Sequence, residues 1–164
     1  MEENFYSEIE LIIDGNFGKL AKHLRFYGIS IYYNVNLDHF ALEKIANDHK
    51  IPLITSSKKH RNKTDCLQLP NTIKSNLISQ INFLCKNYQI NELFDINNTR
   101  CGLCNTLLTI VNYEDNKIYL PLKTLKFYLE SPEKKEILFC LNCKKLYWEG
   151  THWNQILQKI DKWF

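Results

Sequence analysis

Residues 8–28 read EIELIIDGNFGKLAKHLRFYG and decide the fold class of this chain. The β-branched and mostly apolar run of residues 8–13 predicts a strand that ends at Asp14. Over residues 17–27 the apolar side chains recur at helical spacing, and Gly28 is typical of the residue that ends a helix. A strand followed directly by a helix is the basic unit of an α/β protein.

The same alternation continues through residue 55. Residues 29–33 (ISIYY) and 52–55 (PLIT) predict two further strands, and residues 37–49 predict the helix between them. We expect Phe40, Ala41 and Ile45 of that helix to face inward, with Leu37 and Leu42 as further candidates. Strands that alternate with helices of this length imply a parallel sheet, in which functional groups collect beyond the carboxyl ends of the strands.

The rest of the chain suggests two unlike domains. A polar stretch over residues 62–76 is followed by a helical pattern over about 73–88. Beyond residue 98 the alternation of strands and helices stops, and short strand-like pieces carry pairs of cysteines instead. We therefore expect an α/β domain over residues 1–97 and a smaller domain over residues 98–164.

The smaller domain contains two Cys-x-x-Cys pairs. Each pair can chelate one ion from a tight turn, and four thiolates at the corners of a tetrahedron suit Zn²⁺. Because a closed four-thiolate site leaves no open position for water, the zinc is expected to be structural. The strand-like residues 106–113 and 117–121 and a last helix after Gly150 would complete a zinc ribbon. The predicted ligands are Cys101, Cys104, Cys140 and Cys143, and the predicted turn residues are Gly102, Asn105 and Asn142.

Composition sets broad limits on function. The net charge of +3 is mild, so it does not by itself indicate a nucleic-acid-binding protein. The first residues lack the pattern of a secretory signal, and no apolar run is long enough to cross a bilayer. We expect a cytoplasmic protein without a membrane partner. In that reducing compartment, its six cysteines favour metal ligands or core residues over disulfides.

Acidic and basic side chains gather after the predicted strands. Asp14 ends the first strand and Asp38 follows the second, and carboxylates at such positions can coordinate Mg²⁺ or Mn²⁺. Cations beside them suggest a phosphodiester substrate. The residues leave open a plainer interpretation, in which Asp14 belongs to a turn, Asp38 starts a helix and the cations form a solvated face. The candidate phosphate-binding residues are Lys19, Lys22, Arg25, Lys58, Lys59 and Arg61.

Several motifs together resemble the Mut-seven C-terminal RNase domain family, a PIN-like nuclease fold followed by a zinc ribbon. Residues 13–28 (IDGNFGKLAKHLRFYG) resemble the family's opening "VDxMLGKLARWLRLLG". Residues 52–55 correspond to an apolar strand that ends in Thr-Arg-Asp in the family, and Gln80 fits its later "QL" helix. Residues 100–105 (RCGLCN) and 140–152 (CLNCKKLYWEGTH) fit the start and the end of its ribbon.

The resemblance implies a PIN-like parallel sheet with flanking helices and a metal-dependent ribonuclease activity. Asp14 matches the family's first acid and would be a central ligand of Mg²⁺ or Mn²⁺, with Asp38 as a second ligand. Lys19 and Arg25 would position phosphates, or Arg25 would give structural support. The chain departs from the family at Ser57, where the acid of Thr-Arg-Asp is expected, and at Ser30, where the family often has Asp. The alternative is therefore a catalytically degenerate RNA-binding protein.

Aromatic residues of the ribbon leave two interpretations open. Tyr147 and Trp148 come shortly after the second cysteine pair, following Lys144, Lys145 and Leu146. Such side chains can stack on the bases of single-stranded RNA, or they can pack the ribbon against its last helix. If they stack, the zinc ribbon assists RNA binding while the chemistry lies in the first domain.

Overall fold

A computed structural model of the chain describes residues 6–58, 66–111 and 137–148. The chain divides into two compact units, residues 1–105 and 106–164. The boundary expected between residues 97 and 98 stays a prediction, and each unit is described here by itself.

The first unit is built on a four-stranded parallel sheet with the strand order β2-β1-β3-β4. Its strands are β1 (Leu11–Ile13), β2 (Ile31–Tyr33), β3 (Leu53–Thr55) and β4 (Cys66–Gln68). In the register, Ile13 pairs with Tyr33 on one side and with Ile54 on the other. The carboxyl ends of β1, β2 and β3 therefore meet at one edge of the sheet, as the alternating pattern predicts.

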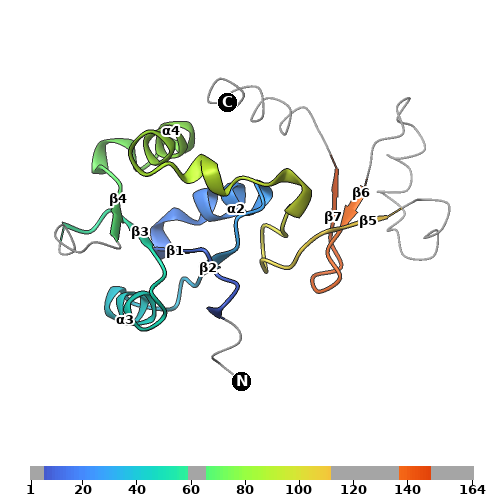
Figure 1. The fold of residues 1–164 in the computed structure, drawn as a ribbon, viewed down its shortest axis with the longest axis horizontal. Helices are drawn as coiled ribbons and strands as arrows, with labels where there is room; N and C mark the ends of the chain where they lie inside the picture. The colour runs from blue at the N-terminus through green and yellow to red at the C-terminus, as the bar shows by residue number, and fades with distance from the viewer. Residues whose placement is uncertain (1–5, 59–65, 112–136, 149–164) are drawn as a thin grey trace. The chain divides into compact units, whose positions relative to one another are not determined.

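Helices cover both faces of this sheet, and Figure 1 shows α3 on one side with α2 and α4 on the other. The helices are α2 (Gly18–Phe26), α3 (His39–His49) and α4 (Leu77–Tyr88). Short 3-10 turns are η1 (Gly15–Phe17), η3 (Asn71–Ile73), η4 (Ile90–Leu93) and η5 (Ile96–Asn98). The predicted α/β class, a parallel sheet with flanking helices, is confirmed.

Apolar side chains of the central strands and of α2 form the core. Ile12, Ile13, Leu20, Leu24 and Ile54 are completely buried. Fully burying one such side chain stabilises the folded state by about 1.5–3 kcal/mol. This core holds the ends of β1 and β3 in fixed positions, and the candidate site lies just beyond those ends.

Two expectations about this unit are wrong. Phe40, expected to face inward, is 70% exposed, because α3 docks on the sheet through Leu42 and Ala46, with the expected Ile45 packed against them. The polar stretch after residue 62 contains β4, which pairs with β3 through Thr55 and Gln68. Three residues of an edge strand are too few to produce a recognisable alternation in the sequence.

The second unit contains an antiparallel sheet with the order β5-β6-β7. Its strands are β5 (Thr109–Val111), β6 (Ile137–Phe139) and β7 (Leu146–Trp148). The expected strand over residues 117–121 and the expected helix after Gly150 lie outside the described residues. Among the residues that are described, no helix has the length and apolar character needed to cross a membrane.

Candidate functional site

Asp14 and Thr55 lie side by side at the carboxyl edge of the parallel sheet. Asp14 is the first residue after β1, and its N–H donates to the carbonyl oxygen of Ile54 in β3 over 3.0 Å. Thr55, the last residue of β3, therefore presents its side chain next to the Asp14 carboxylate. The strand register alone determines this neighbourhood.

Asp14 as a whole residue is 7% exposed, and its carboxylate is held by neutral donors. Its Oδ2 accepts from the Thr55 hydroxyl over 2.8 Å. Its Oδ1 accepts from the backbone and side-chain amides of Asn16 over 3.0 and 2.9 Å. A buried carboxylate is costly unless its oxygens are hydrogen-bonded, so these contacts explain how the chain tolerates it. They also hold its orientation.

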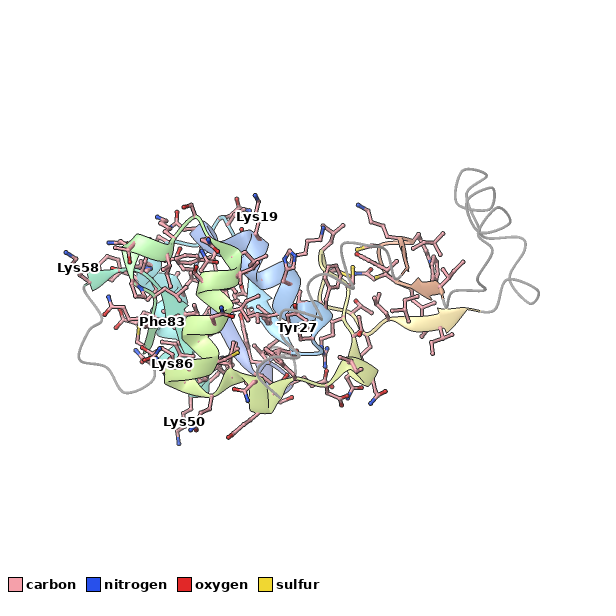
Figure 2. All side chains as sticks on the ribbon, turned by 90° about the horizontal axis from the view of Figure 1, so that it is seen from above. Lys19, Tyr27, Lys50, Lys58, Phe83 and Lys86 are labelled. Atoms are coloured by element: carbon pink, nitrogen blue, oxygen red, sulfur yellow. The ribbon has the colours of Figure 1, made fainter. Side chains whose placement is uncertain are left out.

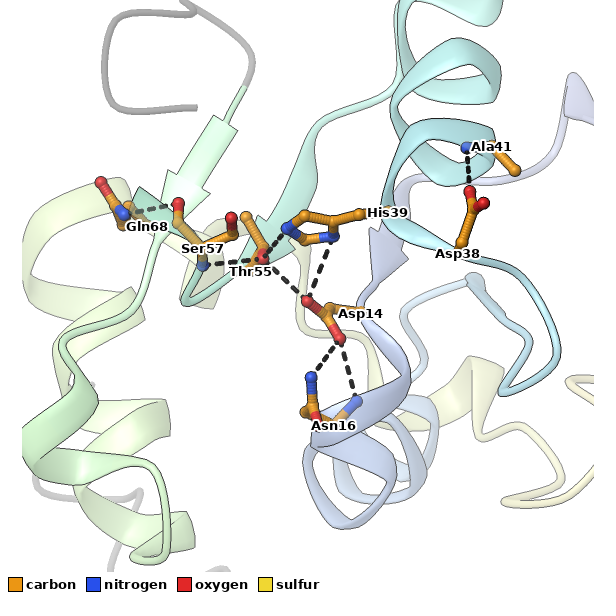
Figure 3. A network of polar contacts seen from close by, with 8 residues as sticks. All are labelled: Asp14, Asn16, Asp38, His39, Ala41, Thr55, Ser57 and Gln68. Carbon is orange, nitrogen blue, oxygen red and sulfur yellow. Dashed lines mark hydrogen bonds and ion pairs between the residues drawn. The ribbon is translucent and has the colours of Figure 1, made fainter. Parts of the chain in front are cut away.

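His39 joins this pair from the first turn of α3. Its Nδ1 lies 3.5 Å from Asp14 Oδ2, and its Nε2 lies 3.3 Å from Thr55 Oγ1. Figure 3 shows the imidazole beside the Asp14 carboxylate and the Thr55 hydroxyl. His39 is not among the residues predicted from the sequence. Its position in the sequence could have indicated it, because His39 directly follows Asp38, the acid expected near the start of the helix after β2.

Asp38 lies next to this group but has a different partner. Its Oδ1 accepts from the Ala41 N–H over 2.8 Å, which makes it the N-terminal cap of α3. Figure 3 shows its carboxylate directed at Ala41 rather than at Asp14. The structure thus brings His39 to Asp14, and the role of Asp38 as a second metal ligand stays a prediction.

Ser57 occupies the rim of the same site. Its N–H donates to Thr55 Oγ1 over 3.1 Å, and its carbonyl oxygen accepts from Gln68 Nε2 over 2.8 Å. Position 57 is where the family's Thr-Arg-Asp motif has its acid. With serine there, this chain lacks a carboxylate close to Thr55 and Asp14.

Ser30, the other departure from the family pattern, lies at the opposite edge of the sheet. It precedes β2, while Asp14 follows the parallel strand β1. Its hydroxyl accepts from Asn105 Nδ2 over 3.0 Å, and it is 1% exposed. The serine at position 30 is therefore part of the fold and does not weaken the Asp14 site.

Three of the predicted phosphate-binding cations are exposed. Figure 2 shows Lys19 and Lys58 directed outward from the first unit, and Lys22 is also exposed on α2. Lys59 and Arg61 lie outside the described residues.

Arg25 is placed differently from the other cations. It is 4% exposed, and its Nη1 donates to the carbonyl oxygens of Gly102 and Leu103 over 3.1 and 3.0 Å. Its Nη2 donates to the carbonyl oxygen of Ile31 over 2.8 Å. A guanidinium buried against three carbonyls supports the backbone rather than contacting a phosphate in solvent. Of the two roles considered for Arg25, the structure therefore favours structural support.

The four paired cysteines come together as a metal-ligand group. The sulfur atoms of Cys101, Cys104, Cys140 and Cys143 all lie within 4.8 Å of one another. Four sulfurs bound tetrahedrally at about 2.3 Å from one Zn²⁺ would be about 3.8 Å apart, so this cluster fits a zinc ion. None of the chain's six cysteines forms a disulfide. In the part of the chain that the structure describes, groups of at least three Cys, His, Asp or Glu side chains close enough to share a metal ion were sought. The group found is this cysteine quartet.

The two cysteine turns share one backbone geometry. The N–H of Asn105 donates to the carbonyl oxygen of Cys101 over 3.0 Å, and that of Lys144 donates to Cys140 over 2.9 Å. Asn105 and Lys144 both have left-handed φ angles, 68° and 56°. Of the predicted turn residues, Gly102 and Asn142 lie within the two turns, and Asn105 and Lys144 take the left-handed positions that end them. The two turns therefore present their cysteine pairs with the same local backbone geometry.

The aromatic residues after the second turn are on β7. Tyr147 is half-buried and pairs with Leu138 of β6. The backbone of Trp148 pairs with Ile137, and its side chain lies outside the described part of the structure. Their contact with RNA stays a prediction.

Comparison with known proteins gives one match. Searches of curated proteins and of solved structures find none. The model of the family described as "Mut7-C RNAse domain" matches residues 9–160 of the 164. This range covers the parallel sheet, the Asp14 site and all four clustered cysteines, and the family description indicates a nuclease-type function. The chain therefore belongs to the Mut7-C RNAse domain family.

Proposed function

We propose that this protein is a metal-dependent ribonuclease that hydrolyses phosphodiester bonds of RNA at the carboxyl edge of its parallel sheet. The observation that carries the proposal is the buried Asp14 carboxylate, positioned by Thr55 and Asn16 where β1 ends. Membership of an RNase domain family supports RNA as the substrate.

Asp14 would hold the divalent ion, because a carboxylate oxygen is the ligand that Mg²⁺ and Mn²⁺ prefer. When bound, such an ion activates water and stabilises charge on the leaving oxygen. The chain's own contribution is positioning. The Thr55 hydroxyl and the Asn16 amides keep the carboxylate in one orientation, so little reorganisation is required when substrate arrives. Asp38 is proposed as a further ligand or as a support for bound water.

Substrate binding would use the exposed cations of the first unit. Lys19, Lys22 and Lys58 are proposed to contact backbone phosphates, and binding should therefore weaken steeply with salt. Phe40 follows His39 directly and is 70% exposed, and its ring is proposed to stack on a base next to the site. Lys59 and Arg61 are proposed to extend the cationic surface.

The zinc ribbon would assist RNA binding. Four thiolates fill the coordination sphere of zinc, so its proposed role is structural and the hydrolysis takes place at Asp14. Tyr147 and Trp148 on β7, with Lys144 and Lys145 before them, are the proposed stacking and phosphate contacts of the ribbon.

Ser57 supports a second candidate function, an RNA-binding protein without turnover. The family's acid would add a carboxylate beside Thr55, and a serine hydroxyl is a weaker ligand for a hard cation. This alternative predicts salt-sensitive RNA binding without metal-dependent cleavage, and it predicts that Ser57→Asp gains activity.

The test is cleavage of a labelled single-stranded RNA by zinc-loaded protein with added Mn²⁺ or Mg²⁺. Asp14→Asn should reduce the rate to background, while Asp48→Asn, a change at an exposed acid of α3, should leave it unchanged. Equal cleavage by wild type and Asp14→Asn would refute the assignment of the site. RNA binding without cleavage by wild type would establish the second candidate.

A further inference from the structure

The donor set around Asp14 includes a nitrogen that the family motifs do not supply. His39 comes from α3, whereas Asp14 and Thr55 come from the ends of β1 and β3. The three side chains converge because α3 starts beside the sheet edge, where the Asp38 cap determines its first residue.

The separation of Asp14 and His39 suits a shared ion better than a direct hydrogen bond. His39 Nδ1 lies 3.5 Å from Asp14 Oδ2, which exceeds the usual N–H···O range of about 2.7–3.2 Å. Adjacent donors of an octahedral ion with bonds of about 2.1 Å are about 3 Å apart. A small movement of the imidazole would therefore place both donor atoms on one cation.

The imidazole is also oriented for this role. Its Nε2 lies 3.3 Å from Thr55 Oγ1, and this contact turns Nδ1 toward the carboxylate. A hydrogen bond to the second ring nitrogen is how metal-binding histidines are commonly held in place. The His39 side chain is 25% exposed against 10% for Asp14, so the pair can be reached from solvent.

We propose that His39 is a ligand of the catalytic ion, next to Asp14, and that it provides the donor that Ser57 no longer supplies. This inference rests on the proposed function, because it concerns the same ion. A nitrogen donor favours first-row transition ions over Mg²⁺, which prefers oxygen ligands. The site should therefore bind Mn²⁺ more tightly than Mg²⁺.

The experiment measures binding of Mn²⁺ to the full-length zinc-loaded protein, from the loss of the electron paramagnetic resonance signal of free Mn²⁺. Mg²⁺ competition against bound Mn²⁺ gives the preference between the two ions. The variants are His39→Gln, which keeps a hydrogen-bonding amide, His39→Asp, which replaces nitrogen with oxygen, and Asp14→Asn. The control is His49→Gln, at an exposed histidine at the other end of α3. Circular dichroism and zinc content verify that each variant is folded.

We expect His39→Gln to raise the Mn²⁺ Kd at least about tenfold and His49→Gln to leave it unchanged. His39→Asp should retain an ion but shift the preference toward Mg²⁺. If Asp14→Asn abolishes Mn²⁺ binding while His39→Gln and His39→Asp change neither affinity nor preference, the assignment of His39 is overturned and the proposed function stands. If wild type binds no Mn²⁺, or if Asp14→Asn binds it as wild type does, both are overturned.

Discussion

Arg25 and Gly102 are joined by a buried hydrogen bond across 77 residues of sequence, from the guanidinium Nη1 to the carbonyl oxygen over 3.1 Å. Arg25 belongs to α2 of the parallel sheet unit, and Gly102 lies inside the first cysteine turn. This bond makes the turn that carries Cys101 and Cys104 a packed part of the first unit. The stability of that unit and the geometry of two of the four clustered cysteines are therefore coupled.

Arg25→Ala should destabilise the protein and weaken zinc binding. The substitution removes the guanidinium donor from the buried contacts to Gly102 and Ile31 and from the partly buried contact to Leu103, and an unsatisfied buried group costs about 1–3 kcal/mol. We expect a loss of about 3 kcal/mol or more in the free energy of unfolding, measured by urea titration. Lys19→Ala, at an exposed position of the same helix, should change it by less than about 0.5 kcal/mol. Similar values for the two variants would contradict the structural role of Arg25.

Removal of zinc should loosen the outer edge of β2. Ile31 donates its N–H to Asn105 Oδ1 over 2.9 Å, and Asn105 ends the first cysteine turn. Without the ion, that turn loses the constraint on its two thiolates, and we expect hydrogen exchange at the Ile31 amide to accelerate. The Asp14 amide, bonded to Ile54 inside the sheet, serves as the internal control and should stay protected. Exchange measured by NMR before and after chelation tests this, and an unchanged Ile31 rate would disprove the coupling.

Gly28→Ala should be strongly destabilising. Gly28 has a φ of 91°, a backbone conformation that residues with a side chain rarely adopt. An added Cβ would also overlap the carbonyl oxygen of Asp95. That segment cannot shift freely, because the Asp95 N–H donates to the Tyr27 carbonyl over 2.8 Å. We expect a loss of more than about 2 kcal/mol in the free energy of unfolding. Gly15→Ala, where the added Cβ would make only ordinary contacts at 3.5 Å, should change it much less.

The protein should lose stability in alkaline solution. Burial raises the pKa of the Tyr27 hydroxyl above its ordinary 10.0, with a further contribution from Cys85. Burial likewise raises the pKa of the Cys85 thiol above its ordinary 9.0. The folded state therefore keeps protons that the unfolded chain releases, so this stability is complete below about pH 9 and falls as pH rises further.

Urea unfolding between pH 7 and pH 11 measures this loss. The Cys85→Ala and Tyr27→Phe variants should each show a smaller fall in the free energy of unfolding above pH 9 than wild type shows. Parallel curves for wild type and both variants would exclude these groups as the cause.

Phe40→Ala should weaken RNA binding without affecting stability. Stacking of a base on an aromatic ring contributes about 1–3 kcal/mol, so a rise of at least about fivefold in the Kd for single-stranded RNA is expected. The measurement is fluorescence anisotropy with Asp14→Asn protein, in which cleavage is not expected. Ile96→Ala, at an apolar residue that is also exposed, should leave the Kd unchanged. Equal affinities would remove Phe40 from the proposed substrate surface.

Local patterns were enough to predict most of the sheet unit. The first strand, the helix after it and its end at Gly28 were predicted because periodicity, β-branching and a glycine stop are properties of neighbouring residues. The edge strand β4 was missed, because three half-buried residues show no period. The inward face of α3 was misjudged at Phe40, because docking on the sheet decides which of several apolar residues is buried.

The sequence by itself determined the family, through motifs that span most of the chain, and the cysteine quartet, because two Cys-x-x-Cys pairs are the ligand pattern expected for a tetrahedral ion. Only the tertiary structure decided which groups surround Asp14. His39 reaches it through the packing of α3, and Arg25 turns away from solvent to bind the first cysteine turn. Both contacts join residues far apart in the chain. Such pairs depend on how whole elements pack together, which the residues flanking either partner do not encode.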